Sequence, residues 1–239
     1  MTQKPVSPPG KPNFLTAALW CLLRQLRRVL LYATSGCLAV IILLIWVNPP
    51  TTYYIWQESQ RLGAVNYSWT AIADIASDLP RAVVAAEDAN FCLHWGFDLS
   101  AIRTAIDEGS RRGASTLTQQ TVKNVLLWPG RSWTRKAFEA LLTPIVEVFW
   151  PKWRILELYL NVVEFDTGVF GVTAAAHHYF DVAPDQLSVL QAAQLAAVLP
   201  APKTRSAAKP SAFLRQRAIA IADGAATIRK DGRARCFED

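Results

Sequence analysis

The sequence has few cysteines and places none of them at the spacing of a metal site. The four, Cys21, Cys37, Cys92 and Cys236, lie far apart, whereas a zinc site needs cysteines or histidines only a few residues from each other. Neither a zinc site nor a disulfide framework is therefore expected. Cys92 and Cys236 could pair in an oxidising compartment, and the sequence leaves that pairing open.

The chain also lacks the basic excess of a nucleic-acid-binding domain. Its net charge is +6. Five positive charges, with no acidic residue among them, precede residue 29: Lys4, Lys11, Arg24, Arg27 and Arg28. The rest of the chain is thus nearly neutral, and nucleic acid is not expected as a partner.

A stretch without any charge runs from Val29 to Val47 and is 19 residues long. At about 1.5 Å per residue, a helix of this length spans the roughly 30 Å of bilayer hydrocarbon. It predicts a transmembrane helix, and the basic residues before it predict a cytoplasmic N-terminus. A cleaved signal peptide is the alternative, but no Ala-x-Ala site follows the apolar run before Pro49.

Alternating strand patterns are nearly absent from the remainder, which predicts a mainly α domain. Apolar residues at three- and four-residue spacing predict helices over 71–76, 80–88, 100–108, 115–127, 134–148, 152–163, 172–179 and 188–198. From Lys203 onward we expect an amphipathic helix and then a frayed end. The expected organisation is a cytoplasmic basic arm (1–28), a transmembrane helix (29–47) and one domain (48–239) with its motifs at about 80–200.

Glu87 ends the apolar run Ala82-Val83-Val84-Ala85-Ala86, where a carboxylate is costly unless it is paired or functional. Asp88 follows it directly, so on a helix the two side chains diverge by about 100° and only one is expected to be a catalytic base. Burial of Glu87 beside Phe91 and Trp95 would suit it to general acid–base work. A salt bridge at the helix end is the alternative.

A second polar segment follows between residues 113 and 124. It contains hydroxyl, amide and amino groups that suit sugar hydroxyls and phosphate oxygens, namely Ser115, Thr116, Gln120, Lys123 and Asn124. Three more cations follow, Arg131, Arg135 and Lys136, interleaved with Trp128, Pro129, Gly130 and Trp133. A solvated charged face is the usual explanation of such a run, but the loop-forming residues favour a cradle for a diphosphate.

Two further segments carry acidic residues. Glu139 lies four residues after Arg135 and three after Lys136, which is the spacing of a helix-surface ion pair. As a second active-site carboxylate it would either orient those cations or act on the donor sugar. Residues 152–161 favour a structural role, in which Glu157 and Asn161, one turn apart, are placed to bond each other.

Together these segments resemble family 51 glycosyltransferases, the peptidoglycan transglycosylases, in the monofunctional form without a transpeptidase domain. The match covers roughly residues 50–205. It consists of five ordered blocks: Glu87-Asp88-x-x-Phe91-x-x-His94-x-Gly96-x-Asp98; Gly113-Ala114-Ser115-Thr116-x-x-Gln119-Gln120-x-x-Lys123-Asn124; Arg135-Lys136-x-x-Glu139; Lys152-x-x-Ile155-Leu156-Glu157-x-Tyr159-Leu160-Asn161; and Gly168-x-x-Gly171 with Ala174-Ala175-Ala176 and Tyr179-Phe180.

The resemblance implies a lysozyme-like fold with a small membrane-proximal jaw near residues 97–112. It implies polymerisation of lipid II into glycan strands with release of undecaprenyl diphosphate, by inverting attack of the acceptor 4-hydroxyl on the donor anomeric carbon. Glu87 would be the general base and Glu139 the second catalytic carboxylate. The cations would hold the diphosphate (Lys123, Arg131, Arg135 and Lys136), while Ser115, Thr116, Gln120 and Asn124 would line the groove.

The resemblance also implies a place and partners for the chain. The anchor would cross the bacterial inner (cytoplasmic) membrane once, with the catalytic domain in the periplasm. Lipid II, the growing strand, and cell-wall synthases or division proteins are the expected partners, and a divalent cation at the donor diphosphate is compatible with this chemistry.

Two other functions remain open at this point. A lysozyme-like hydrolase or lytic transglycosylase needs only one acidic glutamate, but its glycan substrate has no diphosphate for the cations to neutralise. A non-catalytic membrane scaffold needs only a surface, and would not need five intact polar blocks.

Overall fold

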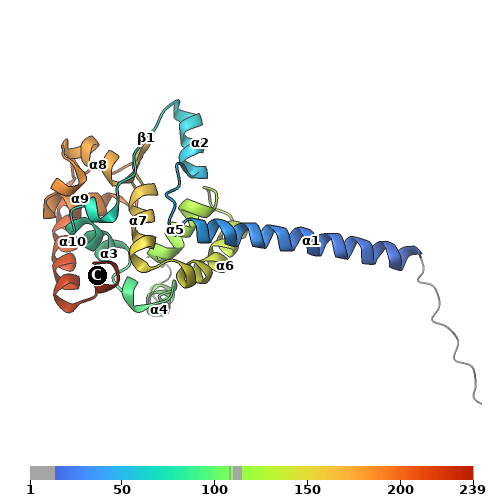
Figure 1. Ribbon diagram of the computed structural model, residues 1–239. Coiled ribbons are helices and arrows are strands. Elements are labelled where there is room, and N and C mark those ends of the chain that lie inside the picture. The colour runs from blue at the N-terminus through green and yellow to red at the C-terminus, as the bar shows by residue number, and fades with distance from the viewer. Residues whose placement is uncertain (1–13, 108, 110–114, 239) are drawn as a thin grey trace, which may run out of the picture. The chain divides into compact units, whose positions relative to one another are not determined.

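The computed structural model describes residues 14–107, 109 and 115–238, with the backbone alone for residues 14–17. The chain forms two compact units, one up to Leu44 and one from Ile45 onward. The described part of the first unit is one helix, α1 (Phe14–Leu43), drawn in blue in Figure 1. Its stretch Ala18–Leu43 is long and apolar enough to cross a membrane, which fits a single-pass anchor.

The ends of this helix differ from the prediction. Residues 24–28, expected in the basic arm, are helical, which is consistent with the high helix propensity of arginine. The helix ends at Leu43, so the predicted end at Val47 is four residues too far along the chain, and residues 44–46 form a turn. Tertiary contacts explain the difference, because the Arg154 guanidinium donates to the backbone oxygen of Val47 (3.0 Å) and to Asn48 Oδ1 (2.9 Å).

The second unit is mainly helical, as predicted. Its helices are α2 (Tyr53–Leu62), α3 (Asp78–Glu87), α4 (Leu99–Asp107), α5 (Leu117–Leu126), α6 (Trp133–Phe149), α7 (Lys152–Val162), α8 (Gly171–Phe180), α9 (Val189–Val198), α10 (Ala212–Asp231) and α11 (Arg235–Glu238). Seven of the eight helices predicted from apolar spacing are present. The eighth, over 71–76, is wrong: only a 3₁₀ turn forms at Ile72–Asp74, where the Glu157 carboxylate accepts the Ile72 N–H (2.8 Å).

Helix α7 is the centre of this unit. Its residues from Arg154 to Val162 are all buried, and α5 packs along it while α6 packs on α5. Helices α3, α9 and α10 pack against one another beside this group and lie together in Figure 1. The first residue of the catalytic motifs, Glu87, is therefore presented from one helical group towards the other.

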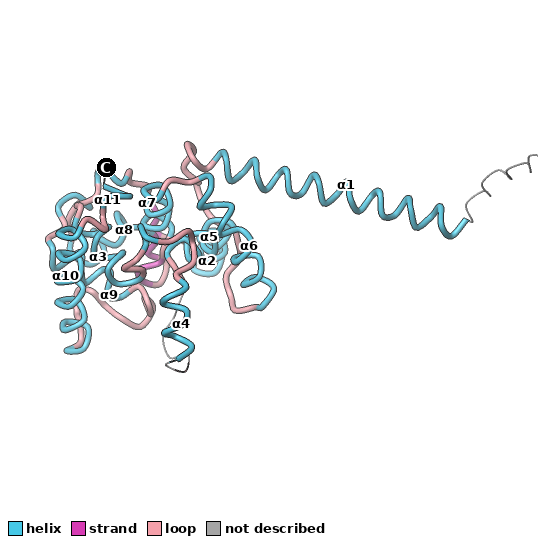
Figure 2. Tube along the Cα trace, turned by 90° about the horizontal axis from the view of Figure 1, so that it is seen from below, coloured by secondary structure: helices cyan, strands magenta, loops and turns pink. Residues whose placement is uncertain are grey.

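Three short strands complete the unit: β1 (Asn66–Tyr67), β2 (Glu164–Asp166) and β3 (Val169–Phe170). Their order is β1-β3-β2, with β1 parallel and β2 antiparallel to β3. Figure 2 shows these strands in magenta among the helices. Two or three residues are too few to give an alternating sequence pattern, which explains why they were not predicted.

The structural role predicted for residues 152–161 is confirmed by what their side chains bind. Asn161 Oδ1 accepts the Thr70 N–H (2.8 Å) and its Nδ2 donates to the backbone oxygens of Thr70 and Glu157 (both 2.9 Å). Glu157 and Asn161 thus bond each other as expected, through the Glu157 backbone oxygen. The Glu157 carboxylate binds Arg154 and Ile72 instead.

Part of the predicted jaw, residues 97–112, falls on α4, which Figure 2 shows reaching out from the other helices of its unit. Residue 108 and residues 110–112 of that prediction, and Gly113 and Ala114 of the second motif block, lie outside the described residues.

Candidate active site

Glu87 is the last residue of α3, and its carboxylate is met by α5. Gln120 Nε2 donates a hydrogen bond to Glu87 Oε2 (3.0 Å), and the Tyr159 hydroxyl of α7 donates to Gln120 Oε1 (3.3 Å). Burial, and the negative charge of Glu87 nearby, raise the pKa of Tyr159 well above its usual range, so this hydroxyl keeps its proton. Tyr159 and Gln120 therefore form a fixed chain of donors that ends on the Glu87 carboxylate.

The alternative interpretation of Glu87, a salt bridge at the helix end, is wrong for the described part of the chain, where no cation lies within ion-pair distance of its carboxylate. The predicted burial beside two aromatic rings is half right. Phe91 is fully buried, but the Trp95 side chain is 73% exposed. The chain turns at Gly96 (φ +80°), whose Cα lies so close to Thr143 that a Cβ there would be 2.5 Å from the Thr143 Cγ2 atom.

Asp88 caps the C-terminus of α3 with a non-helical backbone (φ −161°), and its carboxylate binds groups other than those that bind Glu87. Its Oδ2 accepts the N–H of Leu117 at the start of α5 (2.9 Å), and its Oδ1 lies 2.8 Å from His94 Nε2. Asp88 is buried and joins the end of α3 to the beginning of α5. Asp88 is therefore bonded to the backbone of α5. Among the described residues, the Glu87 carboxylate accepts no hydrogen bond from the backbone.

A cavity of about 260 Å³ opens beside Glu87, and Asn90, Asp98, Ala101, Ser115 and Thr116 also line it. Ser115 Oγ accepts a hydrogen bond from Lys136 Nζ (3.0 Å), which brings the cationic segment to the same place. The Thr116 hydroxyl is already used by the fold, since it donates to the Gly96 oxygen (2.7 Å) and accepts the Gln119 N–H in a capping box.

Glu139 lies on α6 and is almost fully buried, at 2% exposure. Arg135 Nη1 is 2.7 Å from Glu139 Oε2, and Lys136 Nζ bonds Glu139 Oε1. The expected ion pair therefore exists, but it is not at the helix surface: the Arg135 side chain is buried too and also donates to the Gly130 oxygen (2.9 Å). A buried carboxylate with two cations fixes the position of both guanidinium and ammonium groups.

Lys123 links the two carboxylates electrostatically. Burial lowers the pKa of Lys123, and the nearby Arg135 and Lys136 lower it further, while Glu139 and Glu87 oppose the shift. Both carboxylates are therefore close to Lys123, which the sequence alone did not establish. The other predicted ligands differ in exposure: Asn124 is buried on α5, whereas Arg131 is exposed in the loop before α6.

Sequence reasoning missed a half-buried cation near the site, Lys152. Lys152 Nζ donates to the His94 oxygen and to Glu147 Oε1 (both 2.8 Å), and it lies 4.4 Å from the centre of the Phe91 ring. Lys152 opens one of the motif blocks, but Glu147 lies outside all five, so only the fold reveals this pair.

Three possible metal ligands lie in the loop after Glu87: atoms of Asp88, His94 and Asp98 are within 4.8 Å of one another. Protein donors already occupy these carboxylates. Burial would raise the pKa of Asp98, but hydrogen bonds from Ser100, Ala101 and Asn90 bring it down to about 2. The cluster therefore reads as a hydrogen-bonded network that shapes the loop.

Comparison with known proteins decides the family. The family model described as Transglycosylase matches residues 56–225, which contain Glu87, Glu139 and all the cations of the site. The chain belongs to the transglycosylase family. The resemblance predicted from the five motif blocks is thereby confirmed, together with the mainly α fold that follows a single apolar helix.

Relatives within the transglycosylase family match along most of their length. The chain is 54% identical over 234 residues to the biosynthetic peptidoglycan transglycosylase of Jannaschia sp. (strain CCS1), covering 95% of this chain and 96% of the relative. It is 48% identical over 208 residues to the protein of that name from Pseudomonas entomophila (strain L48), covering 82% and 88%. For the protein of that name from Stutzerimonas stutzeri (strain A1501) the identity is 47% over 210 residues, covering 84% and 87%.

Proposed function

We propose that the chain is a peptidoglycan glycosyltransferase that polymerises lipid II into glycan strands and releases undecaprenyl diphosphate. Glu87 removes the proton from the acceptor 4-hydroxyl as that oxygen attacks the anomeric carbon of the donor from the face opposite the diphosphate. A new glycosidic C–O bond forms, the bond to the diphosphate oxygen breaks with its electron pair, and the configuration at the carbon inverts.

The observation that supports this function most is the position of half-buried Lys123, close to both Glu87 and Glu139. A leaving diphosphate accumulates negative charge, which positive groups in a water-poor site stabilise strongly. Lys123, Arg131, Arg135 and Lys136 provide that charge, and Glu139 holds Arg135 and Lys136 in place. Ser115, Gln120 and Asn124 line the groove beside them.

This distribution of charge distinguishes the polymerase from the two other functions. A glycan hydrolase has no diphosphate to stabilise, so four cations beside its general acid would serve no step. A scaffold would not need the buried Glu139 pair, because burying charges costs free energy. The relatives' shared name, biosynthetic peptidoglycan transglycosylase, also favours synthesis.

The deciding experiment is polymerisation of labelled lipid II by the full chain in detergent, with strand lengths read on a gel and muramidase digestion as the control for glycan. Wild type is compared with Glu87→Gln, which has the same shape but cannot take a proton. We expect ladders from wild type and a loss of at least about 100-fold in rate for Glu87→Gln. Asp223→Asn, an exposed carboxylate on α10, is the matched control and should polymerise normally.

Two other results would contradict the proposal. Intact lipid II after incubation with folded wild type would favour the scaffold, and cleavage of preformed glycan would favour the hydrolase. Adding EDTA to the same assay tests the predicted divalent cation at the diphosphate, since a required ion makes the rate fall and an added excess of Mg²⁺ restores it.

We also propose that α1 crosses the inner membrane once, with the N-terminus in the cytoplasm and the catalytic unit in the periplasm. Cys92 and Cys236, both in the second unit, form a disulfide, whereas Cys21 and Cys37 on α1 are free. Disulfides persist in oxidising compartments such as the periplasm. Export therefore accounts for the pairing that the sequence left open.

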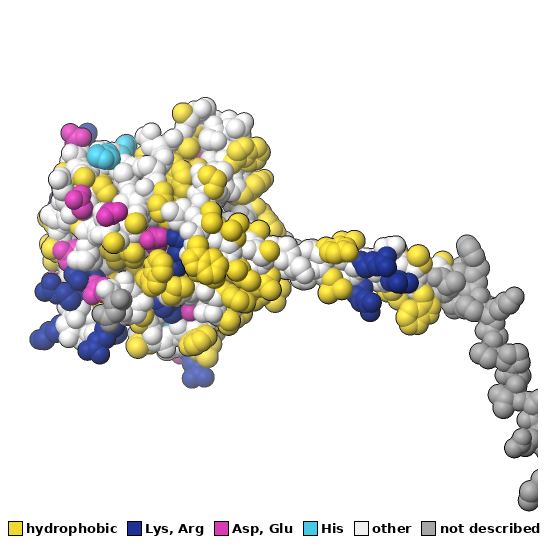
Figure 3. All heavy atoms as spheres, in the orientation of Figure 1, with side chains coloured by type: hydrophobic (Ala, Val, Ile, Leu, Met, Phe, Trp, Pro, Cys, Tyr) yellow, Lys and Arg dark blue, Asp and Glu magenta, His cyan; other side chains and the backbone are white. Residues whose placement is uncertain are grey.

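Exposed apolar side chains support contact of the catalytic unit with lipid. On α6, Trp133 is 91% exposed, and Leu141 and Val148 are more than 60% exposed. Figure 3 shows hydrophobic side chains gathered over this part of the unit. Apolar surface of this kind marks a membrane or protein contact, and a lipid-linked substrate makes the membrane the better match. Labelling of intact cells with a membrane-impermeant reagent at cysteines introduced on α10 tests the orientation.

A further inference from the structure

The last residues of the chain fasten onto the segment that follows Glu87. Helix α10 ends at Asp231, and the chain turns at its cap residue Gly232 (φ +79°). Arg233 Nη1 then donates to the backbone oxygen of Ala89 (3.1 Å), and Cys236 forms the disulfide with Cys92. Ala89 and Cys92, in the loop that follows Glu87 and Asp88, are thus both bound by the C-terminal segment.

Two aromatic rings strengthen this attachment from the inside. Phe237 and Phe91 are both buried, and their ring centres lie 6.4 Å apart. Phe91 is part of the first motif block and also receives the Lys152 ammonium over its ring. The C-terminal segment therefore continues the packing that supports the loop from Ala89 to His94.

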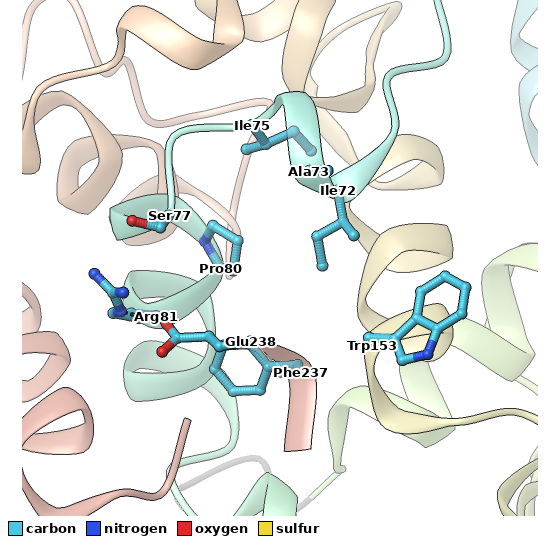
Figure 4. A pocket seen from close by; sticks show the side chains of 9 residues that line it. All are labelled: Ile72, Ala73, Ile75, Ser77, Pro80, Arg81, Trp153, Phe237 and Glu238. Carbon is cyan, nitrogen blue, oxygen red and sulfur yellow. Dashed lines mark hydrogen bonds and ion pairs between the residues drawn. The ribbon is translucent and has the colours of Figure 1, made fainter. Parts of the chain in front are cut away.

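The same segment also holds the helix that carries Glu87. The Glu238 carboxylate pairs with Arg81 Nε on α3, and Arg81 Nη1 lies 3.2 Å from Asp78. Figure 4 shows Glu238 and Phe237 side by side at Arg81, on the wall of a cavity of about 600 Å³. Residues 233–238 thus bind the chain both before and after Glu87, at Arg81 and at residues 89–92.

Residues 233–238, which make these contacts, lie outside the part of the chain that the family model matches, whereas their partners lie inside it. That match ends at residue 225, whereas every residue of the proposed site lies before it. The C-terminal segment is therefore an attachment to the catalytic unit, and it contributes no side chain to the site itself.

We propose that residues 233–238 are a disulfide-latched brace that positions Glu87 for proton removal, with Arg233 as a positioning residue and turnover dependent on the Cys92–Cys236 bond. The inference rests on the proposed function, in which Glu87 is the base. We expect the latched enzyme to be the active form.

The end of a helix is where positioning is needed. The last carbonyl groups of a helix have no intrahelical partner, and such ends open locally more easily than the rest of the fold. Glu87 is the last residue of α3, and Gln120 is its one hydrogen-bond donor among the described residues. A displacement of about 1 Å from the reacting geometry can cost about 100-fold in rate, so loss of the brace would act on turnover.

Reduction provides the switch for the test. A dithiol such as dithiothreitol transfers two electrons and two protons to the Cys92–Cys236 sulfurs, which become two thiols while the reductant becomes a cyclic disulfide. The free cysteines Cys21 and Cys37 can be removed first, because the variant Cys21→Ser/Cys37→Ser keeps the Cys92–Cys236 disulfide as the site of reduction.

The experiment measures kcat and KM for lipid II with the full chain in detergent, oxidised and reduced. For Cys21→Ser/Cys37→Ser, reduction should lower kcat about three- to ten-fold and change KM by less than two-fold. Cys92→Ser/Cys236→Ser should show the low kcat with and without reductant. With the disulfide intact, Arg233→Ala should lower kcat at least two-fold, and Arg233→Lys, which can still donate to Ala89, should recover most of it. Amide hydrogen exchange at residues 85–92 should become faster whenever kcat falls.

Several outcomes would overturn the brace. If the reduced protein stays folded by circular dichroism and keeps the kcat of the oxidised protein, the disulfide only stabilises the fold. A rise in KM at constant kcat would indicate a role in substrate binding instead. If the reduced protein unfolds, Arg233→Ala decides, and an unchanged kcat there refutes the proposal. An oxidised wild type that makes no glycan refutes the proposed function instead; unchanged exchange at residues 85–92 on reduction would then refute the brace separately.

Discussion

Lys123 has the most unusual surroundings of the cations in the site. It is half-buried on α5, and loss of solvent lowers its pKa despite two carboxylates nearby. A lysine of this kind loses its proton at a lower pH than an exposed one, and with the proton it loses its value as a partner for a diphosphate.

This predicts the alkaline side of the activity profile. As pH rises through the lowered pKa of Lys123, kcat/KM should fall, and Lys123→Arg should move that fall to higher pH, because arginine stays protonated. For this group the unfolded chain binds the proton more tightly than the folded one, so its contribution to stability rises with pH in the same window. A loss of fold stability caused by deprotonation of Lys123 therefore cannot explain the fall in kcat/KM. If the pH dependence of kcat/KM for Lys123→Arg falls at the same alkaline pH as that of wild type, Lys123 does not have the proposed role of binding the diphosphate.

Glu139 gives a prediction about stability at the same scale. Glu139→Gln leaves the buried Arg135 guanidinium without its opposite charge, and breaking a buried pair in this way costs about 3 kcal/mol or more of unfolding free energy. Asp78→Asn, which removes a more exposed pair with Arg81, is the comparison and should cost less than about 1 kcal/mol. Urea denaturation measures both, and equal small losses would mean that Glu139 does not hold the cations in place.

At the scale of elements, the junction between α3 and α5 positions the site. Asp88 binds the first N–H of α5, and Thr116 caps the same helix while donating to Gly96. The helix that carries Gln120 and Lys123 is thus fixed at its N-terminus to the segment that carries Glu87. Two motif blocks are joined by hydrogen bonds before any substrate is bound.

Removing the cap should therefore weaken the fold. Thr116→Ala loses both the cap and the bond to the Gly96 oxygen, and we expect a loss of about 1–2 kcal/mol in unfolding free energy. Thr116→Ser keeps the hydroxyl and should lose much less. Chemical denaturation of the two variants side by side is the measurement, and an alanine variant as stable as the serine variant would show that the cap contributes little.

At the scale of the whole molecule, the disulfide closes a loop with a sequence separation of 144 residues. The loop contains the proposed site residues from Ser115 to Glu139, while Glu87 lies five residues before it, next to the cross-link. Cross-links that close long loops restrict the unfolded chain the most in the chain-entropy account. The C-terminal segment, which the sequence predicted to fray, is instead attached at both of its ends.

The double variant Cys92→Ser/Cys236→Ser should accordingly lose about 2–5 kcal/mol of unfolding free energy. The free cysteines provide the control, since Cys21→Ser/Cys37→Ser leaves the cross-link intact and should unfold like wild type. Chemical denaturation without reductant measures the difference. A loss below about 1 kcal/mol would show that non-covalent packing of Phe237 and α10 already fixes the segment.

The sequence by itself determined the features that depend on near neighbours. Helices α3 to α9 follow from the three- and four-residue spacing of apolar side chains, and the anchor follows from its charge-free run. The ordered motif blocks also named the candidate site, because the polar residue types and their spacing lie within single segments.

Only the tertiary structure decided which distant groups meet. It paired Cys92 with Cys236, buried the Glu139 ion pairs that the local spacing had placed at a helix surface, exposed Trp95 and turned the end expected to fray after the amphipathic helix into α11. Each of these depends on packing between segments tens to more than a hundred residues apart, which leaves no periodic trace in either segment. Local periodicity thus fixed the elements, whereas long-range burial fixed the environment of each charge.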